Sequence, residues 1–332
     1  MKKKLVLFIG LALIALNASA QLMPDGTVQI VAYWELGDEA AYRYTTRNEK
    51  IEGNDTTITK ATSEVRVFKV IAQTDSTYTL ETRYKDVSSA TASGAVADLT
   101  AKIGSAGVLH TVTNELGTVK YFADLEDLAG NLQKSISKIV DEYYKSLDKE
   151  TKKNFDKKAM NNYLSQMVAT PSALQATAIN DVAPMLQYHG VHLDTSATYT
   201  MPMNFTMGNG EVITYNSTMY VDSAETDSTF VVIRTHTHAE GEEVYPMMVA
   251  SLITSLSART DASPEEIREA AIEMIDEQGL KMVFDDYSMM TIHLPTGWPV
   301  EHLTARDIVV TDNQGGKSIV TSSTELEYIT EE

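Results

Sequence analysis

Two histidines and a run of acids form the most site-like segment of the chain. It reads His236-Thr237-His238-Ala239-Glu240-Gly241-Glu242-Glu243. Side chains two residues apart on a strand share a face, so His236 and His238 could both bind one metal ion, with the acids as oxygen ligands. The alternative is a solvated strand end that runs into an acidic turn, and no third ligand stands at a diagnostic spacing. We therefore treat His236 and His238 as candidate metal ligands and expect no other cofactor.

A second set of residues could line a groove for an apolar ligand. Trp298 lies between Gly297 and Pro299 at an expected hairpin, where it could stack on a ligand or close a pocket. Met201 and Met203 alternate on an expected strand, and flexible thioethers suit a pocket for varied apolar ligands. The alternative for all three is ordinary core packing, with Trp298 folded over the sheet. We carry them forward as candidate groove residues.

No residue pattern supports a particular enzymatic reaction. Asp285 and Asp286 are adjacent in an apolar strand, so they face opposite ways and cannot act together on one glycosidic bond. The chain has no GxSxG, HExxH, P-loop, GxGxxG or EF-hand pattern. We therefore name no catalytic residue and favour a non-enzymatic protein, while a hydrolase that has an unrecognised site stays open as an alternative.

Strands and helices that would position these residues alternate in blocks. Apolar residues recur at spacings of three and four from residue 124 to 147, which predicts a helix, and a second, more basic helix follows. Thr170 and Pro171 begin a third helix, which Pro184 should limit. Residues 27–36 are rich in β-branched and aromatic side chains and are expected to form a strand.

An internal repeat organises the strands. Residues 73–80 (QTDSTYTL) match residues 225–232 (ETDSTFVV), and the predicted strand order on both sides agrees. We predict an α+β fold of duplicated, predominantly antiparallel β-sheet units. The expected divisions are a signal peptide, a first β-rich repeat, a helical connector, and a second repeat with a helical insertion at 245–279; they cover residues 1–20, 21–122, 123–188 and 189–332.

The first 20 residues indicate export. Three lysines precede an apolar run from Leu5 to Leu16, and Ala18-Ser19-Ala20 is a small-residue cleavage site. The run is too short for a membrane anchor, since a spanning helix takes about 20 apolar residues. Gln21 stands where a lipoprotein signal would place cysteine. We expect the periplasm, or the extracellular space as an alternative, and no membrane span.

Composition excludes several classes of protein. The chain has no cysteine, which rules out disulfides, thiolate metal sites and cysteine nucleophiles. Its net charge of −19 would become −22 on loss of the three leader lysines. Such a surface repels phosphate backbones, so we expect no nucleic-acid partner.

The exported leader, the duplicated β-rich halves and the helical insert together resemble uncharacterised secreted proteins of Gram-negative bacteria. The layout is also similar to that of periplasmic lipoprotein carriers, a resemblance that implies a curved antiparallel sheet and a helical lid around an apolar cavity. We therefore expect a binding or carrier protein with an apolar groove between sheet and helices, whose partner is an apolar small molecule. An envelope interaction or scaffold protein, with another envelope protein as partner, is the alternative.

Overall fold

The computed structural model describes most of the chain after the predicted leader. Residues 1–20 lie outside the described part, as does most of the second TDST sequence at 226–229. The described residues are 22–23, 25–53, 55–89, 107–206, 212–224, 229–257 and 262–329.

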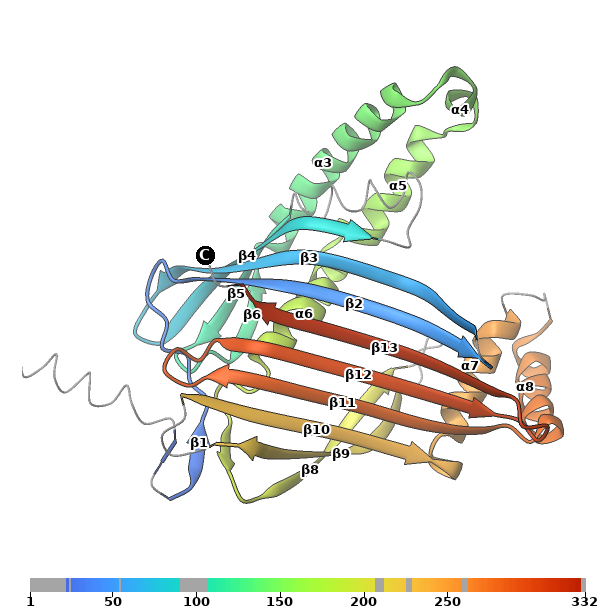
Figure 1. The fold of residues 1–332 in the computed structure, drawn as a ribbon. Coiled ribbons are helices and arrows are strands. Elements are labelled where there is room, and N and C mark those ends of the chain that lie inside the picture. The colour runs from blue at the N-terminus through green and yellow to red at the C-terminus, as the bar shows by residue number, and fades with distance from the viewer. Residues whose placement is uncertain are drawn as a thin grey trace, which may run out of the picture.

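One antiparallel sheet of 11 strands forms the body of the molecule (Figure 1). Its order is β6-β5-β4-β3-β2-β13-β12-β11-β10-β9-β8. β2 from the first β-rich stretch pairs with β13 from the second, so both stretches share this sheet. The strands are β2 (Glu39–Glu52), β3 (Asp55–Gln73), β4 (Thr77–Ser89), β5 (Val108–Asn114), β6 (Val119–Ala123), β8 (Thr198–Thr206), β9 (Val212–Ser223), β10 (Phe230–Glu240), β11 (Lys281–His293), β12 (Pro299–Thr311) and β13 (Lys317–Tyr328).

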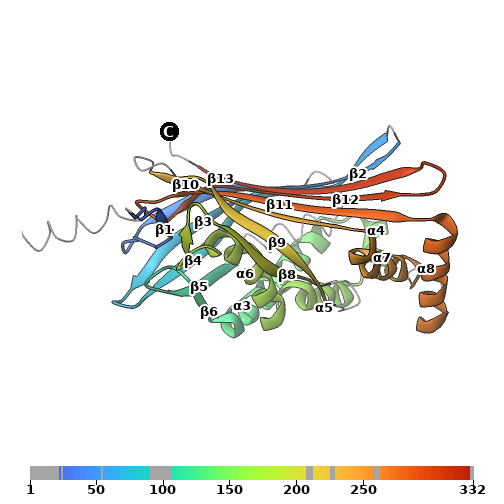
Figure 2. The same ribbon diagram turned by 90° about the horizontal axis from the view of Figure 1, so that it is seen from below.

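The described helices all lie on one side of this sheet, and its two edges bend toward them (Figure 2). We call this side the covered face and the other side the open face. The helices are α3 (Leu125–Ser146), α4 (Lys149–Asn154), α5 (Lys157–Val168), α6 (Pro171–Leu186), η1 (Gly241–Glu243), α7 (Tyr245–Ser257) and α8 (Pro264–Gln278). No helix within the described ranges is long and apolar enough to cross a membrane.

The helical parts follow the predicted signals closely. α3 spans the predicted range, and α8 begins with a capping box between Ser263 and Glu266 and ends at Gly279 in the left-handed conformation. The prediction for Pro184 was wrong, because α6 continues through this proline to Leu186. The expected basic helix is divided in two, since Asp148 and Asp156 cap α4 and α5 separately.

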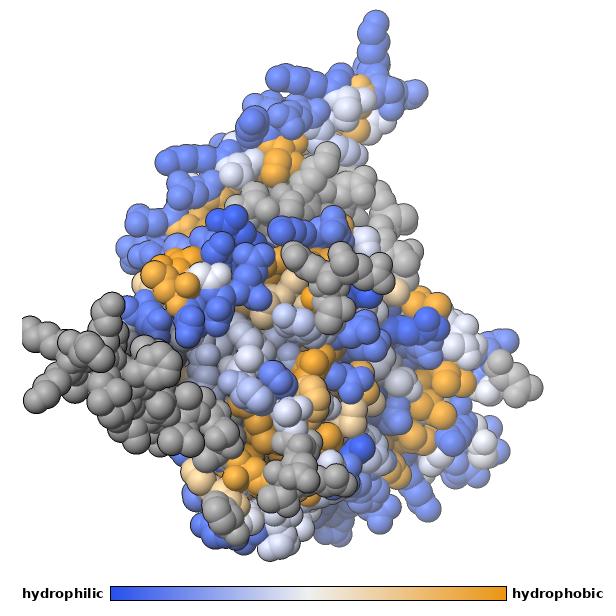
Figure 3. Space-filling model, turned by 60° about the vertical axis from the view of Figure 1, so that its left-hand side comes forward, coloured by the Kyte–Doolittle hydropathy of each residue, from blue (hydrophilic) through white to orange (hydrophobic). Residues whose placement is uncertain are grey.

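α3, α4 and α5 project beyond the sheet as a helical hairpin (Figure 1). α3 packs on α5 through its own apolar cluster, which includes Ile136, Val140 and Leu164. The outer surface of this projection is mainly hydrophilic, while apolar side chains gather in patches nearer the middle of the molecule (Figure 3).

The apolar core under the sheet consists of separate clusters. One places α6 residues such as Val182 and Met185 against Phe68 and Leu80 of β3 and β4. Another, which includes Phe284, packs α7 and α8 against β9, β10 and β11. The α+β fold class is therefore confirmed: a large antiparallel sheet carries clustered helices.

Residues 27–36 differ from the prediction. Only Thr27–Gln29 form a strand, β1, which pairs with β7 (His192–Asp194) in a separate two-stranded sheet. The alternation that predicted a strand is real, since Ile30, Ala32 and Trp34 are all buried. The segment after β1 is extended but does not lie beside a single strand. Its backbone N–H groups donate hydrogen bonds to the carbonyls of Val191, Leu116 and Thr296 in turn, which lie in different parts of the chain.

Candidate functional site

The alternation of β10 decides which of its side chains reach the open face. Ile233 and Ala239 are buried among apolar residues of the covered face. The even-numbered positions between them, His236 and His238, therefore point the other way. On β11, Phe284 is buried on the covered face, which places Asp285 on the open face.

His236, His238 and Asp285 meet on this open face and are called the open-face triad below. β10 and β11 are antiparallel, with His238 opposite Asp285 and His236 opposite Tyr287. His238 Nδ1 lies 2.8 Å and His236 Nε2 3.2 Å from the same oxygen, Asp285 Oδ1. The candidate ligand atoms of the three residues lie within 4.8 Å of one another.

Tyr287 orients part of the triad. Its ring stacks on that of His236 with centroids 4.3 Å apart and planes only 6° from parallel. Its hydroxyl lies 3.5 Å from Asp285 Oδ1 and can donate to it. The tyrosine thus contacts both strands of the site and restricts the rotation of the His236 ring.

The electrostatics of the triad are those of a shared carboxylate. The hydrogen bond with Asp285 raises the pKa of His238. Burial alone would raise the pKa of Asp285, but its hydrogen bonds with His238 and His236 outweigh this and lower it. Glu240 and Glu243 add negative potential near His238. Asp307 lies opposite Asp285 on β12 and accepts a 2.8 Å hydrogen bond from Thr321.

A hollow of about 470 Å³ adjoins the triad. Its lining includes His236 of the triad and the neighbouring Tyr287, and also apolar Met289 and Leu303 together with Arg234. Asp222 accepts a 2.8 Å hydrogen bond from Arg234 Nε. The hollow therefore has apolar surface with a cation and an imidazole on one side.

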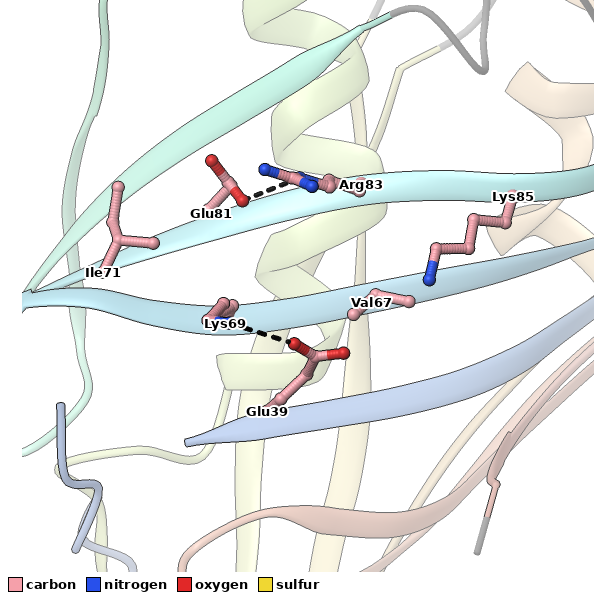
Figure 4. A pocket seen from close by; sticks show the side chains of 7 residues that line it. All are labelled: Glu39, Val67, Lys69, Ile71, Glu81, Arg83 and Lys85. Carbon is pink, nitrogen blue, oxygen red and sulfur yellow. Dashed lines mark ion pairs between the residues drawn. The ribbon is translucent and has the colours of Figure 1, made fainter. Parts of the chain in front are cut away.

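A second hollow, of about 260 Å³, lies across β2, β3 and β4 (Figure 4). Its charges are largely matched in pairs: Lys69 with Glu39 at 3.5 Å and Arg83 with Glu81 at 2.7 Å. Lys85 is the remaining charged residue of its lining. It has no histidine and no aromatic residue in its lining, so it offers less chemistry than the first hollow.

The other predicted site residues lie elsewhere. Trp298 is 7% exposed and stacks on Trp34, with ring centroids 4.4 Å apart, inside the core cluster next to α6. Met201 packs against a different cluster, and Met203 is 50% exposed on the edge strand β8. The structure therefore does not bring Trp298 together with the two methionines, although their role in ligand binding stays a prediction.

Asp285 and Asp286 face opposite sides of the sheet, as the sequence predicted. Asp286 forms an ion pair with Arg306 on the neighbouring strand, with Oδ2 2.9 Å from Nε. Asp285 is the residue of the triad that sequence reasoning missed as a ligand. It lies 47 residues from His238, beyond α7 and α8, so only the strand pairing reveals it.

The triad can act chemically as a metal site or as a hydrogen-bonded ion pair. Two imidazoles and one carboxylate are a common ligand set for zinc and for non-haem iron. The neighbouring hollow gives space for a molecule beside either arrangement.

Comparison with known proteins assigns no family. No protein-family model matches the chain, and no curated protein matches its sequence. Among solved structures, a lipovitellin structure described by its lipid–protein interactions is similar over 89% of this chain at 7% identity and a TM-score of 0.39. This chain spans only a quarter of the length of lipovitellin.

Two outer-membrane proteins are less similar. The COG4313 channel of Pseudomonas putida F1 matches 90% of this chain and 98% of its own length, at 8% identity and a TM-score of 0.19. Vibrio cholerae OmpT matches 89% of this chain and all of its own, at 8% identity and a TM-score of 0.18. All three scores are too low to support a functional argument.

Proposed function

We propose that this is a binding protein that takes an amphipathic small molecule in the hollow of about 470 Å³ on the open face. The observation that carries the proposal is the combination in one lining of apolar Met289 and Leu303 with cationic Arg234. Ligand sites typically combine apolar walls with a few placed polar groups. We keep the predicted binding function but propose a site on the open face in place of the predicted groove between sheet and helices.

The lining favours a ligand with an apolar chain and an anionic end. Arg234 is 43% exposed, and a guanidinium carries five donors, so the bond from its Nε to Asp222 does not use its full capacity. Met289 and Leu303 are directly opposite each other on β11 and β12, where they present adjoining apolar surface. An acid such as decanoate would place its carboxylate near Arg234 and its chain over these two residues.

Calorimetric titration with decanoate tests this proposal, with decanol as the uncharged comparison and EDTA present throughout. We expect decanoate to bind more tightly than decanol. Met289→Glu should weaken decanoate at least about tenfold, which corresponds to about 1.4 kcal/mol. The matched control is Ile58→Glu, because Ile58 is an exposed apolar residue on the far part of β3. Absence of binding, or equal weakening by the two variants, would overturn the proposal.

We further propose that the protein is exported, with the periplasm as its destination. The support is the lysine-rich, apolar and small-residue pattern of residues 1–20. Cell fractionation combined with N-terminal sequencing tests it. A mature chain that begins at Gln21 in the periplasmic fraction is the expected result, and an uncleaved chain in the cytoplasm would contradict it.

We also propose that the two β-rich stretches arose by duplication. If β2–β6 correspond to β8–β12, both sets run in the same order across the sheet, with β13 between them. The first TDST sequence forms the turn between β3 and β4, where Thr74 donates its backbone N–H to Thr77. Gly117 lies in the hairpin between β5 and β6, and Gly297 in the hairpin between β11 and β12. These two hairpins occupy corresponding positions, which also supports the correspondence. Alignment of many related sequences, half against half, would test it.

A further inference from the structure

We propose that the open-face triad binds a divalent transition metal ion, with Zn²⁺ as the preferred ion and Asp285 as the third ligand. This inference does not depend on the small-molecule proposal, because it rests on contacts among the three side chains, of which His236 alone lines the hollow. Its basis is the convergence of two imidazole nitrogens on one carboxylate oxygen across two paired strands.

The nitrogen–oxygen distances of the triad are close to those around a tetrahedral ion. Zinc binds histidine nitrogen and carboxylate oxygen at about 2.0–2.2 Å, which separates neighbouring ligand atoms by about 3.3 Å in a tetrahedron. The nitrogen–oxygen distances of the triad are 2.8 and 3.2 Å. Small side-chain rotations would therefore admit the ion, while the paired strands keep the backbone in place.

The charges around the triad also favour a cation. Glu240, Glu243 and Asp307 surround it. The nearest cation on the same face of β10 is Arg234, whose guanidinium is held by Asp222 on the other side of the strand from β11. An ion that binds neutral histidines and a carboxylate would thus replace the protons that the histidines now share with Asp285.

Ligand type narrows the class of metal. Two imidazoles and one carboxylate suit zinc, iron, cobalt or nickel, whereas calcium and magnesium prefer oxygen ligands alone. Three protein ligands leave at least one coordination position open. His236 and Tyr287 also line the hollow, so this open position would adjoin the proposed binding site.

Titration of the tag-free full chain with Zn²⁺ and with Co²⁺ tests the site. We expect one ion per chain, competition between the two metals, and a visible Co²⁺ spectrum typical of tetrahedral coordination. His238→Gln should weaken zinc at least about tenfold, because loss even of an outer-shell partner costs 10–100-fold in affinity. Zinc should also raise the unfolding midpoint of the wild type more than that of the variant.

His110 provides a matched control. It also lies between two carboxylates, 3.2 Å from Asp124 and 3.7 Å from Glu81, but it has no second histidine in that pair of contacts. His110→Gln should bind zinc as the wild type does. Asp285→Asn is a second test variant and should bind as weakly as His238→Gln. Failure of the wild type to bind, or equal affinity of the His110 and His238 variants, would overturn the inference and leave the triad as a surface ion pair.

Discussion

Each face of the sheet has a partly buried carboxylate that binds basic side chains, but these basic side chains are buried on one face and exposed on the other. On the covered face, Arg66 is only 3% exposed and forms ion pairs with Glu64 and Asp181. On the open face, the two histidines that share Asp285 are 38% and 48% exposed. The carboxylates themselves are alike, since Asp181 is 18% and Asp285 21% exposed. The faces therefore differ mainly in the burial of the partner that the carboxylate holds.

This difference separates structural from functional roles. A buried guanidinium requires its carboxylates, because an unpaired buried charge costs several kcal/mol. An exposed imidazole loses little when its partner is removed, because water solvates it. Ordered, converging side chains that contribute little to folding are available for a ligand, whereas those of the Arg66 network are committed to the fold.

Truncation of Trp298 should produce the largest loss of stability. Trp298→Ala removes a buried ring from its stack on Trp34 and leaves a cavity, for a loss of about 4 kcal/mol in the free energy of unfolding. Tyr287→Ala, which removes an open-face ring that is 45% exposed, should cost less than about 1 kcal/mol. Urea unfolding measures both, and equal losses would contradict the distinction between the faces.

Removal of a buried cation should cost slightly less. Arg66→Met leaves Glu64 and Asp181 without their partner and also removes the guanidinium from its position 3.4 Å over the ring of Tyr44, for a loss of about 3 kcal/mol. Arg234→Met is the open-face counterpart and should change stability by less than about 1 kcal/mol. A small effect of Arg66→Met in urea unfolding would mean that its network is not structural.

Acidification should destabilise the protein through its buried histidines. Burial lowers the pKa of both His189 and His302 to about 4, below the usual value of 6.5. The unfolded chain therefore binds more protons than the folded one below pH 6.5, and stability falls as pH falls toward 4. Each histidine should account for up to about 3 kcal/mol of that loss.

The contribution of one histidine can be isolated by substitution. His302→Gln can keep a hydrogen bond with Ser288, whose hydroxyl lies 3.0 Å from His302 Nε2, but cannot take up the proton. Between pH 6.5 and 4 the variant should lose less stability than the wild type. The difference should be roughly half of the loss that His189 and His302 cause together. Urea unfolding at several pH values measures this slope. An unchanged slope would show that His302 does not contribute.

Local patterns predicted the parts of the fold that depend on neighbouring residues. The spacing of apolar residues located α3, and Thr170 with Pro171 located the start of α6. The prediction that the strand continues through residues 30–36 was wrong. Alternation of apolar residues indicates which side chains are buried, but it does not indicate the hydrogen-bond partners of the backbone. Pro184 was misjudged for a similar reason, since tertiary contacts of Val182 and Met185 hold α6 together around it.

The sequence predicts the two histidines of the candidate site but not its aspartate. His236 and His238 share a face because of strand geometry alone, which a sequence shows directly. Asp285 joins them only through the register of β10 and β11, which are separated in the chain by α7 and α8. That register follows from burial of Ile233 opposite Met290 and Ala239 opposite Phe284, a long-range match that no local spacing encodes.

The two carboxylates offer the closest test of the contrast between the faces, and the smallest expected effect. Asp181→Asn removes the charge that holds Arg66 Nη2 at 3.1 Å, and should cost about 2 kcal/mol because the guanidinium stays buried. Asp285→Asn in EDTA should cost less than about 1 kcal/mol, because both histidines reach water.

Added zinc should then increase the loss of stability that Asp285→Asn causes relative to wild type. Wild type would gain stability by binding the ion and Asp285→Asn would gain less, whereas Asp181→Asn would gain as much as wild type. Urea unfolding of the three proteins with and without zinc measures how much stability each variant loses relative to wild type in each condition. If Asp285→Asn were as costly as Asp181→Asn in EDTA, the open-face triad would be part of the folding core of the sheet and its exposure would not indicate a free site.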